Sequence, residues 1–365
     1  MTRYAADTNL DSERSWREIE NVALTNTKVR PIVAKSDILP SPPEILPPIV
    51  QWHPREPQPN LVNQDKTSTV AALSKTECYS PYHADSRFSL YHGDAANILA
   101  SLEAASVDCI VTSPPYYGQR DYGVSGQLGL EDHPQEYINR LVAVFREARR
   151  VLKPTGSLWV NLGDTYWSGK GRPHGKDPKQ KARRFLRPQD KTGKLPLCRP
   201  KQLLLIPHRF AIAMQEDGWT VRNDNVWRKP RPTPDPAKDR CASSHEYVFH
   251  FVQQRRYYYD YGAVAVPSRG KAKIQAPPTV WDIPTVPSQK EHTAVFPEQL
   301  ALLPIRATFP SDGVLLDPFC GSGTALSVAL RHQEKGKVIG IDISLVALQE
   351  ALTLCTSSRM EPSEH

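Results

Sequence analysis

The sequence predicts an α/β fold, in which helices cover both faces of a mostly parallel β-sheet. From Phe88 onward, apolar runs of strand length alternate with amphipathic stretches of helical length. This alternation is typical of parallel sheets, because each crossover helix packs back onto the sheet. Two of the runs end in loops of unusual composition, at residues 112–116 and 317–324. Ligands of such sheets bind at the carboxyl ends of strands, so the two loops predict one shared site.

The expected strands are short apolar runs bounded by turn residues. They are Phe88–Tyr91, Val107–Val111, Ser157–Leu162, Trp219–Trp227, Glu246–Val252, Gly313–Leu316 and Val338–Ile341. The expected helices carry apolar residues at a spacing of three or four. They are Ala95–Leu102, Gln135–Leu152, Leu203–Glu216, Thr324–Gln333 and Ser344–Cys355.

The most regular helix is expected over residues 135–152. Lys153-Pro154-Thr155-Gly156 ends it, because proline and glycine oppose continuation of a helix. Pro207 is expected either in the first turn of the helix at residues 203–216 or at its true start. One face of the 135–152 helix is apolar and should pack on the sheet; it consists of Ile138, Leu141, Val142, Phe145, Ala148 and Leu152.

Composition limits the class of protein. The 365 residues are 39% hydrophobic and 23% charged, which fits a soluble globular enzyme. No apolar run approaches the ~20 residues that span a bilayer, and the N-terminus lacks the apolar core of a signal peptide, so a cytoplasmic location without membrane contact is expected. The cysteines form no C-x-x-C pair, which argues against a metal site or a disulfide framework and favours reduced thiols. They are Cys78, Cys109, Cys198, Cys241, Cys320 and Cys355.

The first 85 residues form a Pro-rich N-terminal extension that we expect to be partly disordered. Ten prolines fall there, eight of them between Pro40 and Pro59. Proline removes a backbone donor and breaks helices and central strands, so long regular elements are excluded over the proline cluster.

Positive charge is concentrated in one segment. The chain has a formal net charge of +7, and residues 168–201 alone contain twelve Lys or Arg against Asp177 and Asp190. This segment interrupts the strand–helix pattern and is therefore expected to be an insertion. It predicts contact with a polyanion, with an affinity that falls steeply as salt rises. The alternative is a solvated, disordered loop.

The first distinctive loop is Thr112-Ser113-Pro114-Pro115-Tyr116. It offers hydrogen-bond acceptors, from the Ser113 side chain and the Pro114 carbonyl, and its two prolines fix φ and stiffen the loop. Tyr116 is suited to stacking on an extruded nucleobase, a contact worth roughly 1–3 kcal/mol. An extended loop without chemistry is the alternative, and the second loop makes it the weaker one.

The second loop, Asp317-Pro318-Phe319-Cys320-Gly321-Ser322-Gly323-Thr324, follows a strand and opens a helix. Its glycines let a backbone pass close to a ligand, and the helix N-terminus offers unpaired N–H groups. Asp342 ends the following strand, where a carboxylate grips a ribose diol in nucleotide-type sites. The third spaced glycine of dinucleotide sites is missing, so a pyrophosphate ligand fits less well.

Together the two loops resemble the catalytic and cofactor motifs of S-adenosylmethionine-dependent, amino-directed DNA methyltransferases. The catalytic motif comes first, which is the order of the beta class. The resemblance covers roughly residues 88–355. It implies a Rossmann-like methyltransferase fold with a mostly parallel seven-stranded sheet and circularly permuted motif order. The methyltransferase domain would span residues 86–365, with residues 168–201 as an inserted target-recognition region.

The resemblance also implies roles for individual residues. Three of these residues also have a purely structural interpretation. Asp94 could cap a helix, Pro297 could simply start one, and Trp227 could belong to the core. For His245 we expect a structural, hydrogen-bonded position at a strand entry. The implied catalytic residues are Ser113, Pro114, Pro115 and Tyr116; the cofactor-binding residues are Asp94, Phe296, Pro297, Asp317, Phe319, Gly321, Gly323, Thr324 and Asp342; and the DNA-binding residues are Lys170, Arg172, Lys181, Arg183, Arg184, Arg187, Trp227 and Lys229.

The substrate expected from the resemblance is the N4 amine of a flipped cytosine in double-stranded DNA, since Ser-Pro-Pro-Tyr resembles the cytosine-N4 group. Adenine-N6 enzymes more often carry Asp or Asn before the prolines. Attack at cytosine carbon-5 calls for a Pro-Cys nucleophile, and none of the cysteines follows a proline. Less favoured alternatives are a protein-glutamine methyltransferase and a non-catalytic DNA-binding protein. A cognate restriction endonuclease is a candidate partner, and the oligomeric state stays open.

Overall fold

The structure is a computed structural model that describes residues 79–169, 188–191, 198–232, 234–235, 237–268, 273–286 and 297–358. Almost all of the expected N-terminal extension and most of the basic insertion lie outside these residues. Within the described part of the chain, no helix is both long and apolar enough to cross a membrane.

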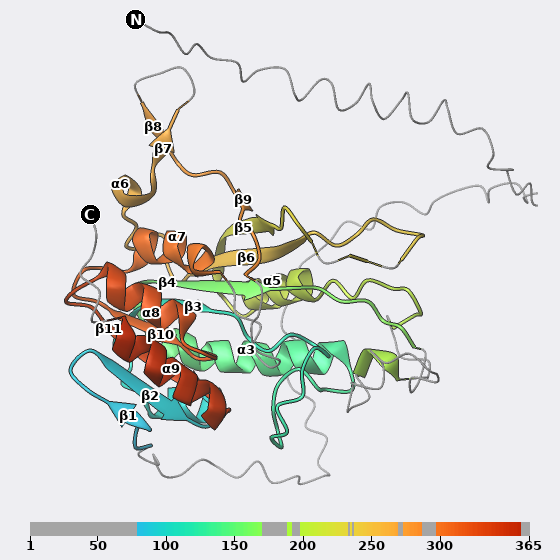
Figure 1. The fold of residues 1–365 in the computed structure, drawn as a ribbon, viewed down its shortest axis with the longest axis horizontal. Helices are drawn as coiled ribbons and strands as arrows, with labels where there is room; N and C mark the ends of the chain where they lie inside the picture. The colour runs from blue at the N-terminus through green and yellow to red at the C-terminus, as the bar shows by residue number, and fades with distance from the viewer. Residues whose placement is uncertain are drawn as a thin grey trace, which may run out of the picture. The chain divides into compact units, whose positions relative to one another are not determined.

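A mixed sheet forms the centre of the described residues (Figure 1). Five neighbouring strands are parallel, and β6 is antiparallel to both of its neighbours, β4 and β5. In spatial order the strands are β1 (His83–Ala84), β2 (Phe88–His92), β11 (Lys337–Asp342), β10 (Val314–Asp317), β3 (Val107–Thr112), β4 (Leu152–Leu162), β6 (His245–Val252), β5 (Thr220–Arg228) and β9 (Val280–Asp282).

The sheet has nine strands among the described residues, whereas the sequence predicts seven. The seven expected strands are all present, and the two additional ones are the short edge strands β1 and β9. They have two and three residues, too few to leave a periodic pattern. A separate two-stranded ribbon pairs β7 (Val266–Pro267) with β8 (Ile274–Gln275).

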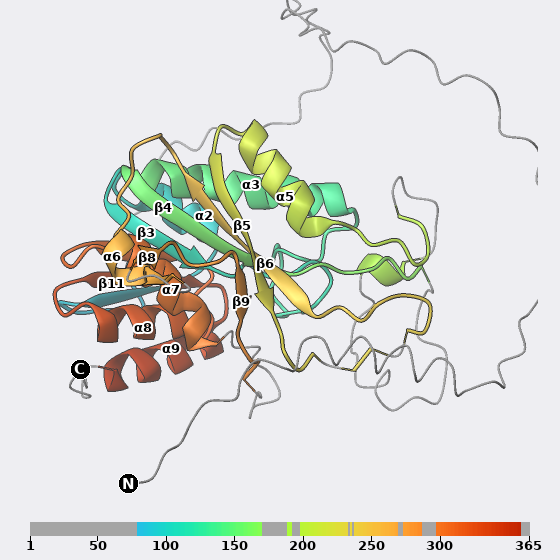
Figure 2. The ribbon, with the colours of Figure 1, turned by 90° about the horizontal axis from the view of Figure 1, so that it is seen from above.

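Helices cover both faces of the sheet, as predicted (Figure 2). One apolar cluster includes residues of α2, α3 and α5, and a second includes residues of α7, α8 and α9. The helical segments are α2 (Ala95–Ser101), α3 (Pro134–Val151), the 3-10 turn η1 (Pro188–Asp190), α5 (Ile206–Glu216), α6 (Tyr261–Val264), α7 (Glu298–Thr308), α8 (Thr324–His332) and α9 (Leu345–Ser357).

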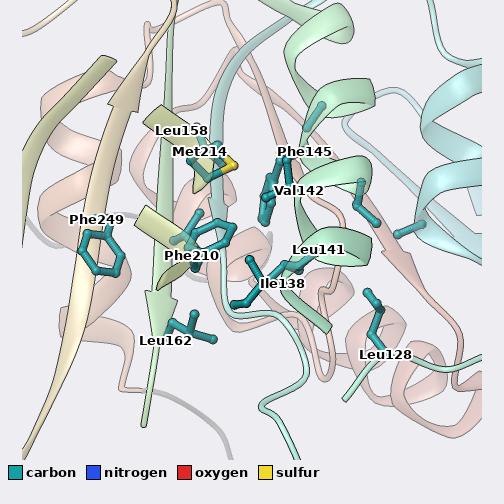
Figure 3. Packing of buried hydrophobic residues seen from close by; sticks show 14 of the residues in the cluster. Leu128, Ile138, Leu141, Val142, Phe145, Leu158, Leu162, Phe210, Met214 and Phe249 are labelled. Atoms are coloured by element: carbon teal, nitrogen blue, oxygen red, sulfur yellow. The ribbon is translucent and has the colours of Figure 1, made fainter. Parts of the chain in front are cut away.

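The apolar face predicted for α3 is buried in the first cluster (Figure 3). Phe145 meets Phe210 of α5 with ring centroids 5.5 Å apart, and Leu158 of β4 belongs to the same cluster. Burying one such side chain stabilises the fold by about 1.5–3 kcal/mol. Residues 135–152 therefore hold their helix against the sheet through ordinary core packing.

The connection after α3 differs from the prediction. The helix ends at Val151, and β4 begins at Leu152, so Lys153-Pro154-Thr155-Gly156 belongs to the strand rather than to a loop. Lys153 donates to the carboxylate of Asp108 on β3 at 2.8 Å, and a Cβ on Gly156 would lie 2.7 Å from the carbonyl oxygen of Asp108. Leu152 pairs with Val107 and Ser157 with Cys109, so residues 153–156 form an irregularity in the pairing with β3 that contacts to Asp108 hold in place.

Candidate active site

The two distinctive loops meet at the centre of the sheet. β3 and β10 are parallel neighbours, so their carboxyl ends lie at the same edge. Thr112, the last residue of β3, donates its hydroxyl to Oδ1 of Asp317, the last residue of β10, at 2.6 Å. These residues lie 205 positions apart in the chain. The predicted shared site is therefore formed by direct contact between the two strand ends.

Asp317 is a buried carboxylate that shapes the second loop from within. Its Oδ1 also accepts the N–H of Phe319 at 3.0 Å. Burial raises the pKa of Asp317 to about 7, with a smaller opposing effect from the Thr112 hydrogen bond. Asp317 is 1% exposed, so it supports the loop and does not itself face a ligand.

Gly321 and Gly323 serve different purposes. Gly321 has a φ of +52°, its N–H donates to Oδ2 of Asp342 at 2.8 Å, and a Cβ placed on it would meet no described atom within 4 Å. Gly323 has a φ of +85°, and a Cβ there would lie 2.9 Å from the Cβ of Ala351 in α9. The ligand-approach interpretation thus suits Gly321, whereas Gly323 permits close packing of α8 on α9.

Asp342 ends β11 beside the end of β2. Its carboxylate accepts the N–H groups of Gly321 and Ser344, each at 2.8 Å, and burial raises the pKa of its carboxyl. Its carbonyl accepts the N–H of Gly93 at 3.0 Å. The adjacent Asp94 caps α2 by accepting the N–H of Asn97. Its side chain therefore has the helix-capping role that was the alternative to cofactor binding. Each Asp342 oxygen keeps a second lone pair for a ligand hydroxyl.

The loop after the catalytic motif reaches the same edge of the sheet. Partial burial raises the pKa of Tyr122; the neighbouring charge of Asp342 adds to this effect, and Arg120 opposes it. Tyr122 is 38% exposed. The sequence showed Tyr122 after the prolines but assigned it no role.

The catalytic loop is fixed by contacts to its backbone. The hydroxyl of Tyr137 on α3 donates to the carbonyl oxygen of Pro115 at 2.8 Å. Pro114 is buried, and Ser113 is half-buried. Because the prolines already restrict φ, the Tyr137 bond leaves little freedom in the peptides that follow Ser113.

Beneath this loop lies a group of polar side chains that we call the Glu246 cluster: Ser113, Tyr116, Asn161, Lys229 and Glu246. The Tyr116 hydroxyl donates to Oε2 of Glu246 at 2.6 Å and accepts from Nδ2 of Asn161 at 2.8 Å. Lys229 forms an ion pair with Oε1 of Glu246. The sequence placed Ser113, Tyr116 and Lys229 in functional roles, whereas it gave no individual role to Asn161 or to Glu246, which lies in a segment, residues 244–247, that resembles a part of the family near the target base.

Tyr116, for which stacking on a base stays a prediction, is also anchored within the protein. A Cβ on Gly163 would lie 2.8 Å from its ring, so the ring packs against that backbone. Burial raises the pKa of the Tyr116 hydroxyl well above its ordinary value, and the carboxylate of Glu246 adds to the effect. In this structure Tyr116 is held as a member of the cluster by its hydroxyl.

The predicted DNA-binding residues fall into two groups. Trp227 is 4% exposed and donates its indole N–H to the Ile283 carbonyl, which places it in the core, the alternative left open by the sequence. Lys229 faces Glu246 rather than solvent. His245 bonds the Tyr247 hydroxyl at 3.3 Å at the start of β6, as predicted. Outside the described residues lie Lys170, Arg172, Lys181, Arg183, Arg184 and Arg187.

The other predicted cofactor residues are found at helix starts or beside the glycine turn where the structure describes them. Thr324 is the first residue of α8, and Pro297 directly precedes α7, so its expected place at a helix start is confirmed. Phe319 is half-buried beside the glycine turn. Phe296 lies outside the described residues.

The sequence of the chain matches a known protein family. Residues 107–352, which include both loops and the Glu246 cluster, match the family model described as DNA methylase, of the N6/N4 type. The chain belongs to this DNA methylase family. It is therefore an enzyme that uses S-adenosylmethionine.

Named relatives agree with this assignment. The methylase is 41% identical over 280 residues to the Type II methyltransferase M.Cfr9I of Citrobacter freundii, covering 76% of this chain and 91% of that protein. It is 44% identical over 254 residues to the Type II methyltransferase M.SmaI of Serratia marcescens, covering 69% and 85%. The fold is similar to that of the PvuII DNA methyltransferase (cytosine-N4-specific), with a TM-score of 0.56, 22% identity, and coverage of 79% and 91%.

The second loop of this methylase fits S-adenosylmethionine. Gly321 has open space where a side chain would stand, and the first turn of α8 offers N–H groups without helical partners. Asp342 has carboxylate lone pairs at the neighbouring strand end. The residues that would hold the cofactor are those of this turn, and Asp342 would accept hydrogen bonds from its hydroxyl groups.

Proposed function

We propose that this methylase transfers a methyl group from S-adenosylmethionine to the N4 amine of cytosine in double-stranded DNA. The observation that carries the proposal is the 2.6 Å bond between Thr112 and Asp317, since it puts Ser113-Pro114-Pro115 beside the glycine turn. Serine before the two prolines favours cytosine N4 over adenine N6. The printed description of the similar PvuII enzyme as cytosine-N4-specific supports the same choice.

In the proposed reaction, the loop at residues 112–116 activates the exocyclic amine of the base, which is a weak nucleophile. The lone pair of an exocyclic amine is delocalised into the ring, so acceptors around its N–H bonds favour the pyramidal geometry that frees it. Ser113 Oγ and the Pro114 carbonyl are the acceptors we propose. S-adenosylmethionine supplies an electrophilic methyl group when bound. Alignment at about 3–3.5 Å then provides much of the rate enhancement.

The substrate base must leave the duplex to reach the loop, at a cost of a few kcal/mol. We propose that the basic segment at residues 168–201 binds DNA phosphates and holds the duplex while the base is out. The sequence-independent contacts would come from Lys170, Arg172, Lys181, Arg183, Arg184 and Arg187. With Trp227 in the core and Lys229 paired with Glu246, we do not assign phosphate contacts to these two.

A place in a restriction–modification pair fits this activity. The relatives quoted above are named Type II methyltransferases. We propose that methylation of a short DNA sequence by this enzyme protects that sequence from a partner endonuclease. Adenine N6 is the second candidate, because the family model spans both amino-directed activities.

The experiment is nucleoside analysis. Duplex DNA from a host lacking methylases is incubated with the purified enzyme and S-adenosylmethionine, digested, and examined by mass spectrometry. A reaction without the cofactor is the control. We expect N4-methylcytosine. If N6-methyladenine appears instead, the substrate is adenine, and if neither appears, the proposed activity is wrong.

A further inference from the structure

The Glu246 cluster brings together side chains from four parts of the fold. Ser113 and Tyr116 lie in or directly after the loop that follows β3. Asn161 lies on β4, Glu246 lies on β6, and Lys229 directly follows β5. Glu246 and Lys229 are largely shielded, with side chains 15% and 21% exposed. The cluster therefore exists only because the antiparallel strands β5 and β6 extend the parallel sheet beside the catalytic strand.

Glu246 fixes the direction of the surrounding hydrogen bonds. An ionised carboxylate accepts hydrogen bonds and donates none. Its Oε2 receives the Tyr116 hydroxyl at 2.6 Å and the Asn161 amide at 3.2 Å, while Oε1 receives the Lys229 ammonium. Lys229 offsets the charge of the carboxylate. The donors around Glu246 thus all point toward it.

This direction determines how Ser113 is oriented. The hydrogen of the Tyr116 hydroxyl is used on Glu246, so the Tyr116 oxygen presents only lone pairs to its other neighbours. Ser113 Oγ lies 3.4 Å from that oxygen, a long contact in which Ser113 is the donor. The serine hydrogen therefore points into the cluster. The lone pairs of Ser113 are left for a substrate.

The amide of Asn161 is oriented by the same two acceptors. Its Nδ2 donates to both Tyr116 and Glu246. Its Oδ1 must then face away from them, and it accepts no hydrogen bond from the described residues although Asn161 is 5% exposed. A buried acceptor without a donor is costly. A ligand N–H group would satisfy it.

We propose that Glu246, balanced by Lys229, is a positioning residue that keeps the oxygens of Ser113 and Asn161 as hydrogen-bond acceptors toward the target base, with Ser113 and the Pro114 carbonyl receiving the two N–H bonds of its amine. This inference rests on the proposed function. It explains how a cluster of hydroxyl and amide groups, which can each donate or accept, presents only acceptors to a substrate. Such a pocket favours a base bearing an amine over one bearing a carbonyl at the same position.

The test is a double-mutant cycle of Glu246→Gln and Tyr116→Phe. The first keeps the size of the side chain and removes its acceptor-only character; the second keeps the ring against Gly163 and removes the hydroxyl. Rate constants are measured in single turnovers with saturating DNA and cofactor, so that product release does not enter. Asp217→Asn is the matched control, since its ion pair with Arg146 lies beyond the opposite end of β5.

We expect Glu246→Gln to lower the rate constant about 10- to 100-fold, with cofactor affinity changed less than about twofold. In the Tyr116→Phe background, the fold-loss in rate constant caused by Glu246→Gln should be at least about threefold smaller. The reason is that the hydroxyl oriented by Glu246 is already absent. Asp217→Asn should leave the rate constant unchanged. Unfolding temperatures confirm that each variant is folded.

If the unmutated enzyme is active and the double variant loses the product of the two single losses in rate constant, Glu246 does not act through Tyr116. The proposed function would still stand. An unmutated enzyme that transfers no methyl group would overturn both. If Glu246→Gln fails to fold, Lys229→Met replaces it in the cycle and must show the same dependence on the Tyr116 hydroxyl.

Discussion

At the scale of single residues, Ser113 is the side chain on which the proposed chemistry most depends. We predict that Ser113→Ala lowers the methyl-transfer rate about 100- to 1000-fold, the usual cost of removing one preorganised polar contact to a reacting group. Transfer of labelled methyl groups to DNA measures it. Ser101→Ala is a matched control, because Ser101 only donates to a carbonyl of its own helix. Retention of more than half the activity by Ser113→Ala would contradict the assignment.

Sequence reasoning finds residues whose partners are close in the chain. Ser113, Gly321 and Asp342 each stand in a short motif after a predicted strand, and the structure brings all three to one edge. Asn161 and Glu246 escape such reasoning, because their importance arises from strand pairing across the sheet. A buried carboxamide at the end of a strand gives no local signal until Tyr116 is seen to bind it.

At the scale of elements, the turn into α8 contains two glycines that should respond differently to substitution. We predict that Gly321→Ala weakens binding of S-adenosylmethionine more than about tenfold and destabilises the fold by only about 1–2 kcal/mol, the cost of a left-handed backbone. The added methyl group meets no described protein atom, so it enters the space assigned to the cofactor.

The matched substitution is Gly323→Ala, for which we predict the opposite balance. Its methyl group would meet Ala351 at 2.9 Å, so α8 and α9 must separate in addition to the backbone strain. The expected loss of stability is about 2–4 kcal/mol. Urea unfolding and titration calorimetry measure the two effects. Equal losses of affinity and stability in both variants would show that the two glycines share one role.

The elements themselves were largely predictable. All seven expected strands occur, because each is a short apolar run between turn residues, and the five helices expected within the described residues occur, because each carries apolar residues at a spacing of three or four. A further helix considered at residues 12–24 lies outside the described residues. The predicted start of the strand at Ser157 was wrong, since β4 begins at Leu152, and Pro154 and Gly156 fall in an irregularity of the pairing with β3 rather than in a loop. β1 and β9 form only through pairing with a neighbouring strand, so no local pattern announces them.

At the scale of the whole molecule, two buried ionisable groups give opposite dependences of stability on pH. Burial against Trp159 lowers the pKa of His250 to about 3, from 6.5, so the unfolded chain binds more protons between these values and stability falls as pH drops through this range. The pKa of Asp317 is raised from 3.8 to about 7, so its contribution is lost as pH rises through that interval. Each slope reaches at most about 1.4 kcal/mol per pH unit.

We predict that substitution separates the two slopes. Relative to the unmutated enzyme, Asp317→Asn should gain about 2 kcal/mol of unfolding free energy on going from pH 5 to pH 8. His250→Gln should gain a similar amount on going from pH 6.5 to pH 4.5. Urea unfolding at each pH measures both. If either variant keeps the pH dependence of the unmutated enzyme, the corresponding group does not titrate as described.

The position of β10 has a consequence for biosynthesis. This strand lies between β3 and β11, yet residues 314–317 emerge from the ribosome long after β3 and β4. Until then, the catalytic strand has one edge without a partner, and neither Asp317 nor the glycine turn exists to receive the cofactor. A nascent chain therefore stays inactive until β10 is inserted beside β3, so methylation begins only after nearly the whole described fold has been translated.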